Sequence, residues 1–148
     1  MRFTTLFIFT FLISLKSLAQ FGLEDYEWKN RIVLIVSDDE TSPNYLKQLQ
    51  ELENDTKGFS ERKLLVFDIQ KEKYRKIQFA QAKKSVGNWR RYNVLFEMFS
   101  REGIPFSVIL IGLDGGIKRV YKNKVVTKEE LFATIDSMFL RQQELNEN

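Results

Sequence analysis

The densest group of reactive side chains in this sequence is a run of acids and hydroxyls: Asp38, Asp39, Glu40, Thr41 and Ser42. The carboxylates of Asp38, Asp39 and Glu40 could bind a hard cation such as Ca²⁺ through oxygen, although their spacing matches no EF-hand loop. A buried carboxylate here could instead act as a general acid or base. A third interpretation is a solvated loop whose acids favour the start of the following helix. We adopt this third interpretation and predict no metal site.

Two residues could join this run in catalysis. Thr41 is a poor nucleophile without a base, and the chain contains no His to supply one. Arg62 precedes a predicted strand and could hold an anion, pair with Asp38 or Asp39, or form an ordinary surface ion pair. Asp38, Asp39, Thr41 and Arg62 are therefore the candidate residues of a cysteine-independent enzyme.

Two missing residue types restrict the chemistry further. The 148 residues include no Cys and no His. Their absence excludes disulfides, thiol redox chemistry, Cys nucleophiles, Cys/His zinc sites and triads that use imidazole. We therefore predict no thiol oxidoreductase or peroxidase activity and no cofactor, and we favour a protein that binds over one that catalyses.

A basic stretch over residues 71–91 is the strongest charge feature, with eight basic residues against one acid. The basic residues are Lys71, Lys73, Arg75, Lys76, Lys83, Lys84, Arg90 and Arg91. Such a surface could hold an anionic partner, either a protein or an envelope glycan; the alternative is a solvated face. An acidic segment, residues 38–55, carries six acids against one Lys. The opposite charges predict a dipole and weak self-association.

Apolar runs predict the strands that position these groups. Continuous runs rich in Val, Ile and Leu predict buried strands over residues 31–36, 63–68 and 106–111, followed by a hairpin strand over 117–126. The polar residues 70–85 fit either an exposed hairpin or an irregular excursion.

Helical spacing of apolar residues predicts three helices. The first covers residues 43–55, with Ser42 as its N-cap and Pro43 at its first position. The second covers residues 86–101 and places Trp89 on its buried face.

The third helix begins at Thr127, which forms a capping box with Glu130, and its apolar face extends to Phe139. The tail from Arg141 is polar, and we expect it to fray. The first two strands should be parallel with a right-handed crossover, and the last two should be antiparallel. We predict an α/β fold of thioredoxin-like plan, a central mixed β-sheet flanked by helices.

Two segments resemble thioredoxin. Residues 103–111 resemble the segment in which a cis-proline precedes the hairpin strand. Thr41-Ser42-Pro43-Asn44 falls where thioredoxins carry Cys-Gly-Pro-Cys, with Thr41 and Asn44 at the two cysteine positions. The resemblance implies a cis bond before Pro105. It also implies a degenerate thioredoxin site formed by Thr41, Ser42, Pro43, Asn44 and Pro105.

Three further segments, residues 28–34, 108–118 and 131–144, resemble the family known as domain of unknown function 4174. This family is a thioredoxin- or peroxiredoxin-like domain of exported bacterial proteins and of vertebrate secreted matrix proteins. The resemblance covers nearly all of residues 24–144. One departure is Phe139, which stands where the family pattern has Pro. The resemblance implies a fold and export, and it implies no reaction.

The N-terminus has the pattern of a secretory signal peptide over residues 1–19. Arg2 supplies positive charge, residues 3–15 are mostly apolar, and Ser17-Leu18-Ala19 predicts cleavage before Gln20. The apolar run is shorter than the roughly 20 residues that a spanning helix needs. We therefore expect no transmembrane span after cleavage.

The expected mature chain, residues 20–148, is a single thioredoxin-like domain with a polar tail from residue 141. It carries 21 basic and 20 acidic residues, and this balance, with export, argues against a nucleic-acid partner. We predict an exported, periplasmic or extracellular, redox-inactive protein that acts as a non-catalytic binding or accessory module. One alternative is a cysteine-independent enzyme at the carboxyl edge of the sheet, and another is a structural envelope or matrix protein.

Overall fold

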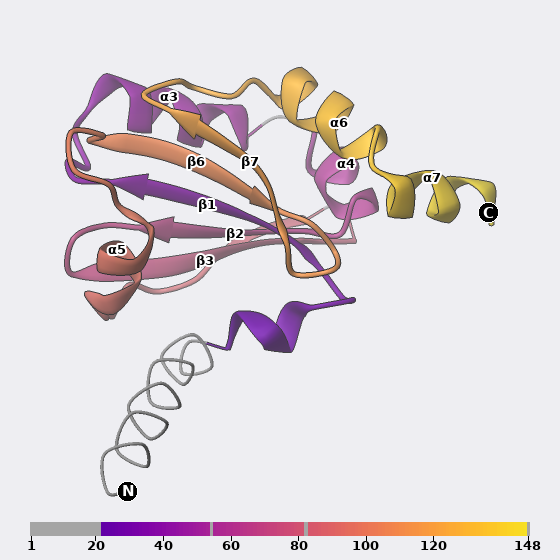
Figure 1. Ribbon diagram of the computed structural model, residues 1–148, viewed down its shortest axis with the longest axis horizontal. Coiled ribbons are helices and arrows are strands. Elements are labelled where there is room, and N and C mark those ends of the chain that lie inside the picture. The colour runs from indigo at the N-terminus through magenta and orange to yellow at the C-terminus, as the bar shows by residue number, and fades with distance from the viewer. Residues whose placement is uncertain (1–21, 54, 82, 148) are drawn as a thin grey trace, which may run out of the picture.

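A mixed seven-stranded sheet forms the centre of the molecule (Figure 1). The computed structural model describes residues 22–53, 55–81 and 83–147, so the predicted signal peptide and its cleavage site lie outside the described residues. The strands are β1 (Arg31–Ser37), β2 (Leu64–Ile69), β3 (Lys73–Ala80), β4 (Lys83–Val86), β5 (Arg90–Arg91), β6 (Phe106–Ile111) and β7 (Ile117–Lys122). Their order is β4-β3-β2-β1-β6-β7, and β5 pairs with β3.

The two strands at the centre of this order are completely buried. β1 pairs in parallel with β2, from Arg31 opposite Leu64 to Val36 opposite Ile69, and it pairs antiparallel with β6. All residues of β1 and β2 are buried. Because both faces of these strands are covered, they read as continuous apolar runs rather than as an alternating pattern.

Helices cover both faces of the sheet (Figure 1). They are η1 (Leu23–Tyr26), α3 (Pro43–Glu51), α4 (Thr56–Glu61), α5 (Val94–Phe99), α6 (Lys128–Asp136) and α7 (Phe139–Asn146). Residues of α3, α4 and α6 belong to one core cluster, and residues of η1 and α5 belong to the cluster on the opposite face. The arrangement is a thioredoxin-like α/β fold, as predicted.

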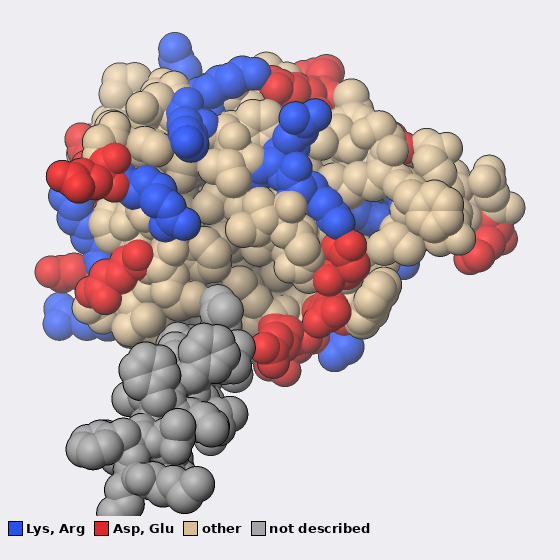
Figure 2. Space-filling view, in the orientation of Figure 1, with Lys and Arg blue, Asp and Glu red and all other residues tan. Residues whose placement is uncertain are grey.

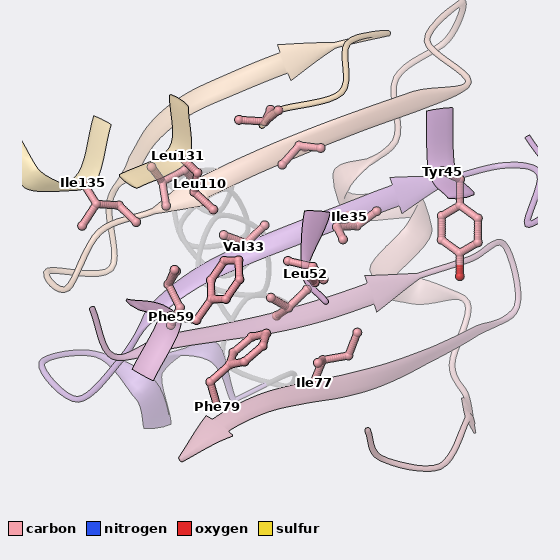
Figure 3. Packing of buried hydrophobic residues seen from close by; sticks show 14 of the residues in the cluster. Val33, Ile35, Tyr45, Leu52, Phe59, Ile77, Phe79, Leu110, Leu131 and Ile135 are labelled. Carbon is pink, nitrogen blue, oxygen red and sulfur yellow. The ribbon is translucent and has the colours of Figure 1, made fainter. Parts of the chain in front are cut away.

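The core beneath α3, α4 and α6 is built around stacked aromatic side chains (Figure 3). The ring of Phe59 stacks on that of Phe79, with 4.6 Å between the ring centroids. Leu131 and Ile135 approach from α6, and Ile35 lies on β1 below (Figure 3). This packing holds three helices against one face of the sheet.

The predicted starts of the first and third helices are confirmed. The side chain of Ser42 accepts the N–H of Tyr45, and Pro43 occupies the first turn of α3. The Oγ1 atom of Thr127 accepts the N–H of Glu130 at the start of α6. The carboxylate of Glu130 binds Lys124.

The first predicted helix is too long. α3 ends at Glu51, and α4 begins after Asp55, whose carboxylate accepts the N–H of Gly58. Asp55 has φ 73°, in the left-handed region, which cannot continue a right-handed helix. The apolar pattern continues across this break, so periodicity alone did not locate it.

The second predicted helix is wrong over its first half, where the chain forms β4 and β5. Only α5, Val94–Phe99, is helical in this part of the described chain. β4 pairs with β3, which makes residues 73–86 a hairpin, one of the two structures considered for residues 70–85. The apolar spacing fits a helix, but pairing with β3 supplies the backbone with sheet partners instead.

The predicted fraying of the C-terminal tail is also wrong. α6 ends at Asp136, and α7 follows as a separate helix. Arg141 is buried, and Glu144 accepts a hydrogen bond from Arg31 at 3.1 Å. Ion pairs of its polar residues, rather than an apolar face, therefore hold α7 against the rest of the molecule. The last predicted strand likewise ends early, at Lys122.

The predicted cis bond before Pro105 is wrong, because the described chain contains no cis peptide bond. Pro105 nevertheless lies where the resemblance to thioredoxin placed it. Its carbonyl oxygen accepts the N–H of Asp38 at 3.0 Å, next to the pair formed by Ser37 and Phe106.

Within the described part of the chain, we find no helix that is both long enough and apolar enough to cross a membrane.

Candidate functional site

The acidic loop between β1 and α3 is organised by its own hydrogen bonds. The Oδ1 atom of Asp39 accepts the backbone N–H of Thr41 at 2.8 Å and its hydroxyl at 2.7 Å. The hydroxyl of Ser37 donates to the carbonyl oxygen of Asp39 at 2.8 Å. The oxygens proposed as catalytic or metal-binding groups thus fix the shape of the loop.

The charge of Asp39 agrees with this structural role. The hydrogen bonds from the hydroxyl and N–H of Thr41 lower the pKa of Asp39, and the charge of Lys71 adds to the effect. A carboxylate with a lowered pKa is a weaker base, whereas general base catalysis near neutral pH needs a raised one. Asp39 therefore lacks the environment of a catalytic base.

The candidate Ca²⁺ ligands do not converge. Asp38, Asp39 and Glu40 are all exposed, and the carboxylate of Glu40 binds Lys73 at 2.7 Å. Among the residues that the structure describes, no group of three or more acidic side chains could hold a metal ion.

The positions that hold the thioredoxin cysteines contain groups that support local structure. Thr41 is bound to Asp39, as described above, and Ser42 caps α3. The side-chain amide of Asn44 lies 3.5 Å from the carbonyl oxygen of Asn123. The residues that the resemblance aligns with the thioredoxin cysteines thus form the end of a loop and the start of α3, and the side chains of Thr41, Ser42 and Asn44 are engaged by neighbouring groups.

A shallow cavity of about 340 Å³ lies beside Asp38 and Pro105. Asp38, Lys71 and Pro105 contribute to its wall, together with residues 100–104. Asp39 and Thr41 are not among the residues that line it. The cavity thus brings together one of the candidate catalytic residues and Pro105, but not the full set.

Arg62 lies at the other end of the sheet. It precedes β2, whereas Asp38 follows the parallel strand β1, and about 3.3 Å per residue along seven residues separates the two ends. Arg62 donates from Nε and Nη2 to the two carboxylate oxygens of Asp136, at 3.0 and 2.6 Å. Its guanidinium also lies 3.9 Å from the ring centroid of Phe132. Of the three roles considered for Arg62, the structure shows an ion pair, and the partner is Asp136 rather than Asp38 or Asp39.

A buried polar cluster, on the face of the sheet that α3, α4 and α6 cover, was not predicted from the sequence. Asp68 on β2 is 0% exposed. Its carboxylate accepts hydrogen bonds from the hydroxyl of Tyr45 at 2.9 Å, from Arg75 Nε at 2.8 Å and from Gln70 Nε2 at 3.3 Å. Three donors satisfy this buried charge, as burial requires.

Tyr45 is strongly affected by this environment. Burial raises the pKa of Tyr45, and the charge of Asp68 and the hydrogen bond to it raise it further. The phenol is therefore held as a proton donor to Asp68 and is not a nucleophile or base. The sequence signal for the cluster was a single carboxylate at the end of an otherwise apolar run, residues 64–69.

The basic stretch does not form one surface. Alternate residues of β3 point to opposite faces of the sheet, so Lys73 and Arg75 lie on the face opposite Lys76. Lys73 and Arg75 approach the ring of Trp89, at 4.7 and 4.4 Å from its centroid. On the other face, Lys76 donates to the hydroxyl of Tyr26 at 3.1 Å. Trp89 therefore packs with cations at the surface rather than in the core.

Much of the charge of the basic stretch is neutralised within the molecule. Lys73 pairs with Glu40, Arg75 pairs with Asp68 and Lys84 pairs with Glu53. In the described part of the chain, Lys71, Lys83, Arg90 and Arg91 have no such pairing, and all four are exposed. On the face shown in Figure 2, basic and acidic residues are interspersed. The candidate anionic-partner face thus reduces to four exposed basic residues, of which Lys83 lies on β4 and Arg90 and Arg91 form β5.

Comparison with known proteins adds a family to this description. The chain matches no curated protein and no solved structure. A family model described as Domain of unknown function (DUF4174) matches residues 22–144, which span η1, the sheet and most of α7. The predicted family is confirmed: this cysteine-free chain belongs to the DUF4174 family.

Proposed function

We propose that this protein is an exported, redox-inactive, thioredoxin-like module that acts by binding a partner rather than by catalysis. The observation that carries the proposal is the state of the turn at the thioredoxin cysteine positions. Its hydroxyl and carboxylate groups hold the loop and cap α3, and Thr41 is bound to a carboxylate whose pKa is lowered.

The candidate catalytic residues support the same conclusion. An enzyme site normally gathers several polar groups with altered proton affinities around one cavity. Here Asp38 lines a shallow cavity, Asp39 and Thr41 lie outside it, and Arg62 is bound to Asp136 at the opposite end of the sheet. Tyr45, whose pKa is strongly raised, has its side chain buried against Asp68 in the core and lies outside this cavity.

The test of redox inactivity uses the purified mature chain. We expect no reduction of insulin and no thiol-coupled consumption of peroxide, because thiolate chemistry requires a cysteine. A thioredoxin assayed in parallel provides the positive control. Turnover by metal-free protein above the buffer blank would overturn the proposal.

Export is tested separately by the intact mass of the protein recovered from a bacterial host. We expect the measured mass to be that of a chain beginning at Gln20, because Ser17-Leu18-Ala19 has the pattern of a signal-peptidase site. An Ala19→Arg variant removes a small residue of the pattern and should block cleavage. A Leu18→Lys variant keeps both small residues, Ser17 and Ala19, and is the control that should still be cleaved. Recovery of a chain that retains residues 1–19 would contradict the export proposal and leave the binding proposal in place.

A further inference from the structure

A cavity of about 460 Å³ lies beside α7, far along the chain from the thioredoxin-like turn. Its walls come from the start of β1, the turn after β6 and the segment that joins α6 to α7. Two large aromatic side chains at this cavity are exposed to solvent, Trp28 by 62% and Phe139 by 74%. A cavity of this size is in the range of small-molecule sites.

Arg31 is one of three charged residues in the cavity wall, the others being Asp114 and Lys118. It is the first residue of β1, and its side chain is 0% exposed. Its Nη1 atom donates to the carbonyl oxygen of Arg62 at 3.2 Å and to Glu144 at 3.1 Å. Its Nε and Nη2 atoms have no hydrogen-bond partner among the described residues. Leaving such buried donors unpaired is costly, and more so for a charged group.

The two unpaired atoms form one edge of the planar guanidinium. Nε–H and Nη2–H project side by side, on the side opposite Nη1, because the group is rigid and trigonal. Arg62 uses this same edge to bind both oxygens of Asp136, at 3.0 and 2.6 Å. Arg31 therefore presents the two-donor edge that fits a carboxylate.

Arg31 is itself one of the residues that line the cavity. The Nη1 atom of Arg31 points toward Arg62 and Glu144, on the side of β1 occupied by β2. The opposite side of β1 is occupied by β6, and the residues that follow β6, Gly112 and Leu113, line the cavity. The unpaired edge is therefore the part of the Arg31 guanidinium that its partners on the β2 side leave unused, at the wall of this cavity.

The surrounding charges favour an anion at this position. The ion-pair network around α7 contains four cations, Arg31, Arg62, Lys63 and Arg141, but two carboxylates, Asp136 and Glu144. On the other wall of the cavity, Lys118 and Asp114 pair at 2.7 Å and neutralise each other. The excess of positive charge therefore belongs to the network that includes Arg31.

Trp28 is held at the cavity by an unusual backbone. It has φ 62°, in a region that bulky residues rarely adopt, and its N–H donates to the carbonyl oxygen of Leu113 at 2.6 Å. Residues in such conformations concentrate at ligand sites. An exposed indole fixed next to a guanidinium suits a ligand with both a ring and an anionic group.

We propose that this cavity binds a small carboxylic acid that carries a six-membered ring. The carboxylate receives Nε–H and Nη2–H of Arg31, and the ring packs against Trp28 and Phe139. Because Arg31 lies beneath the cavity surface, side chains of residues 138–140 move aside as the ligand enters. The inference rests on the proposed function, since it names the ligand class of a binding module.

Calorimetric titration of the mature protein tests the proposal with two pairs of probes. Glucuronate and glucose share a sugar ring, and phenylacetate and phenylacetamide share an aromatic ring. We expect at least one acid to bind about tenfold or more tightly than its neutral analogue, because hydrogen bonds to charged groups carry that difference. The stronger acid distinguishes a sugar ligand from an aromatic one. Equal binding of acid and neutral analogue in both pairs, or tighter binding of inorganic phosphate than of either acid, would overturn the proposal.

Two substitutions locate the binding. Arg31→Lys keeps the charge but removes the two-donor edge, and it should weaken the acid about tenfold or more. Trp28→Ala alters an exposed residue and should also weaken it without unfolding the protein. The matched controls are Arg119→Lys and Trp89→Ala, which do not line the cavity and should leave affinity unchanged. If Arg31→Lys does not fold, an unchanged affinity of Trp28→Ala still overturns the proposal.

The two proposals fail in different ways. Absence of binding by all four probes would overturn the carboxylate site and leave the redox-inactive module standing. Turnover in the insulin or peroxide assay would overturn the module, whatever the titrations show.

Discussion

Asp68 shows how one buried side chain organises its neighbourhood. Its carboxylate is 0% exposed and is held by Tyr45 from α3, Arg75 from β3 and Gln70 from the connecting turn. One residue therefore ties a helix and two strands together at the carboxyl end of β2. Buried ion pairs of this kind fix geometry, and losing one partner leaves the others unsatisfied.

We predict that Asp68→Ala destabilises the protein by about 3 kcal/mol, because it removes the acceptor shared by a buried phenol and a partly buried guanidinium. The free energy of unfolding, measured by urea denaturation, provides the test. Asp38→Ala is the matched control, since Asp38 is exposed, and it should change stability by less than about 0.5 kcal/mol. Equal losses in the two variants would show that the Asp68 cluster contributes nothing particular.

We predict that Trp89 contributes less to the free energy of unfolding than a tryptophan in the core would. It is partly exposed and packs against Lys73 and Arg75, and cation–π contacts at such sites are worth about 0.5–1 kcal/mol each. We expect Trp89→Ala to cost on the order of 1–2 kcal/mol, well below the roughly 3–5 kcal/mol of a buried Trp. A loss in the core range, measured by urea denaturation, would contradict the surface position of Trp89.

Residues such as Trp89 and Arg62 show the limit of sequence reasoning at this scale. The sequence indicates residue types that can do chemistry, but the partner of each depends on contacts between distant segments. Arg62 and Asp136 are 74 positions apart in the chain and meet only in the folded molecule. Asp39 and Thr41 are neighbours in sequence, and the adopted interpretation of a loop without chemistry did not specify the hydrogen bonds between them.

At the scale of elements, α7 is attached through charges. Its residue Glu144 accepts hydrogen bonds from Arg31 and Arg141 and pairs with Lys63 at 2.9 Å. Burial alone would raise the pKa values of Glu144 and Asp136, but the neighbouring cations outweigh this effect and lower both. The folded state therefore stabilises the ionised carboxylates.

We predict that Glu144→Gln destabilises the protein by about 2–3 kcal/mol, because it leaves the buried guanidinium of Arg31 without a counter-charge. Glu61→Gln is the control, since Glu61 forms an exposed pair with Lys57, and such pairs contribute about 0–1 kcal/mol. The comparison is made by urea denaturation at neutral pH. Similar losses in both variants would mean that α7 is held by something other than this network.

The same network predicts a loss of stability in acid. The pKa values of Asp136 and Glu144 lie below their ordinary values of 3.8 and 4.5. Their contribution is therefore complete above the ordinary values and is lost as pH falls through the lower, folded-state pKa values. We expect the urea midpoint to fall more steeply below about pH 4 in the parent than in an Asp136→Asn/Glu144→Gln double variant. Parallel curves would contradict the prediction.

Elements with strong local signals were predictable, and elements defined by distant partners were not. The buried strands and the caps at Ser42 and Thr127 follow from short-range chemistry. The break between α3 and α4 depends on the left-handed backbone of Asp55, and β4 depends on its pairing with β3. α7 departs from expectation because its docking uses ion pairs, which apolar periodicity does not detect.

At the scale of the whole molecule, the predicted charge separation is largely cancelled by folding. The acidic segment, residues 38–55, lies against the basic stretch, residues 71–91, through pairs such as Lys73–Glu40 and Lys84–Glu53. Opposite charges that lie far apart would form a dipole, whereas adjacent charges cancel within a short distance. The charge argument for weak self-association therefore loses most of its force.

We accordingly predict that the mature protein is a monomer whose mass does not depend on salt. The exposed edge of β7 carries Lys118, Arg119 and Lys122, and charged edge strands disfavour pairing with a second copy. Sedimentation velocity from micromolar to near-millimolar concentration, at low and high ionic strength, provides the test. A Lys122→Val variant is the control, because it removes one charge from the β7 edge. If the charges on this edge prevent pairing with a second copy, this variant should associate more than the parent. Association of the parent protein that disappears in high salt would show that the remaining surface charge still draws copies together, and it would favour the structural envelope or matrix protein over the binding module.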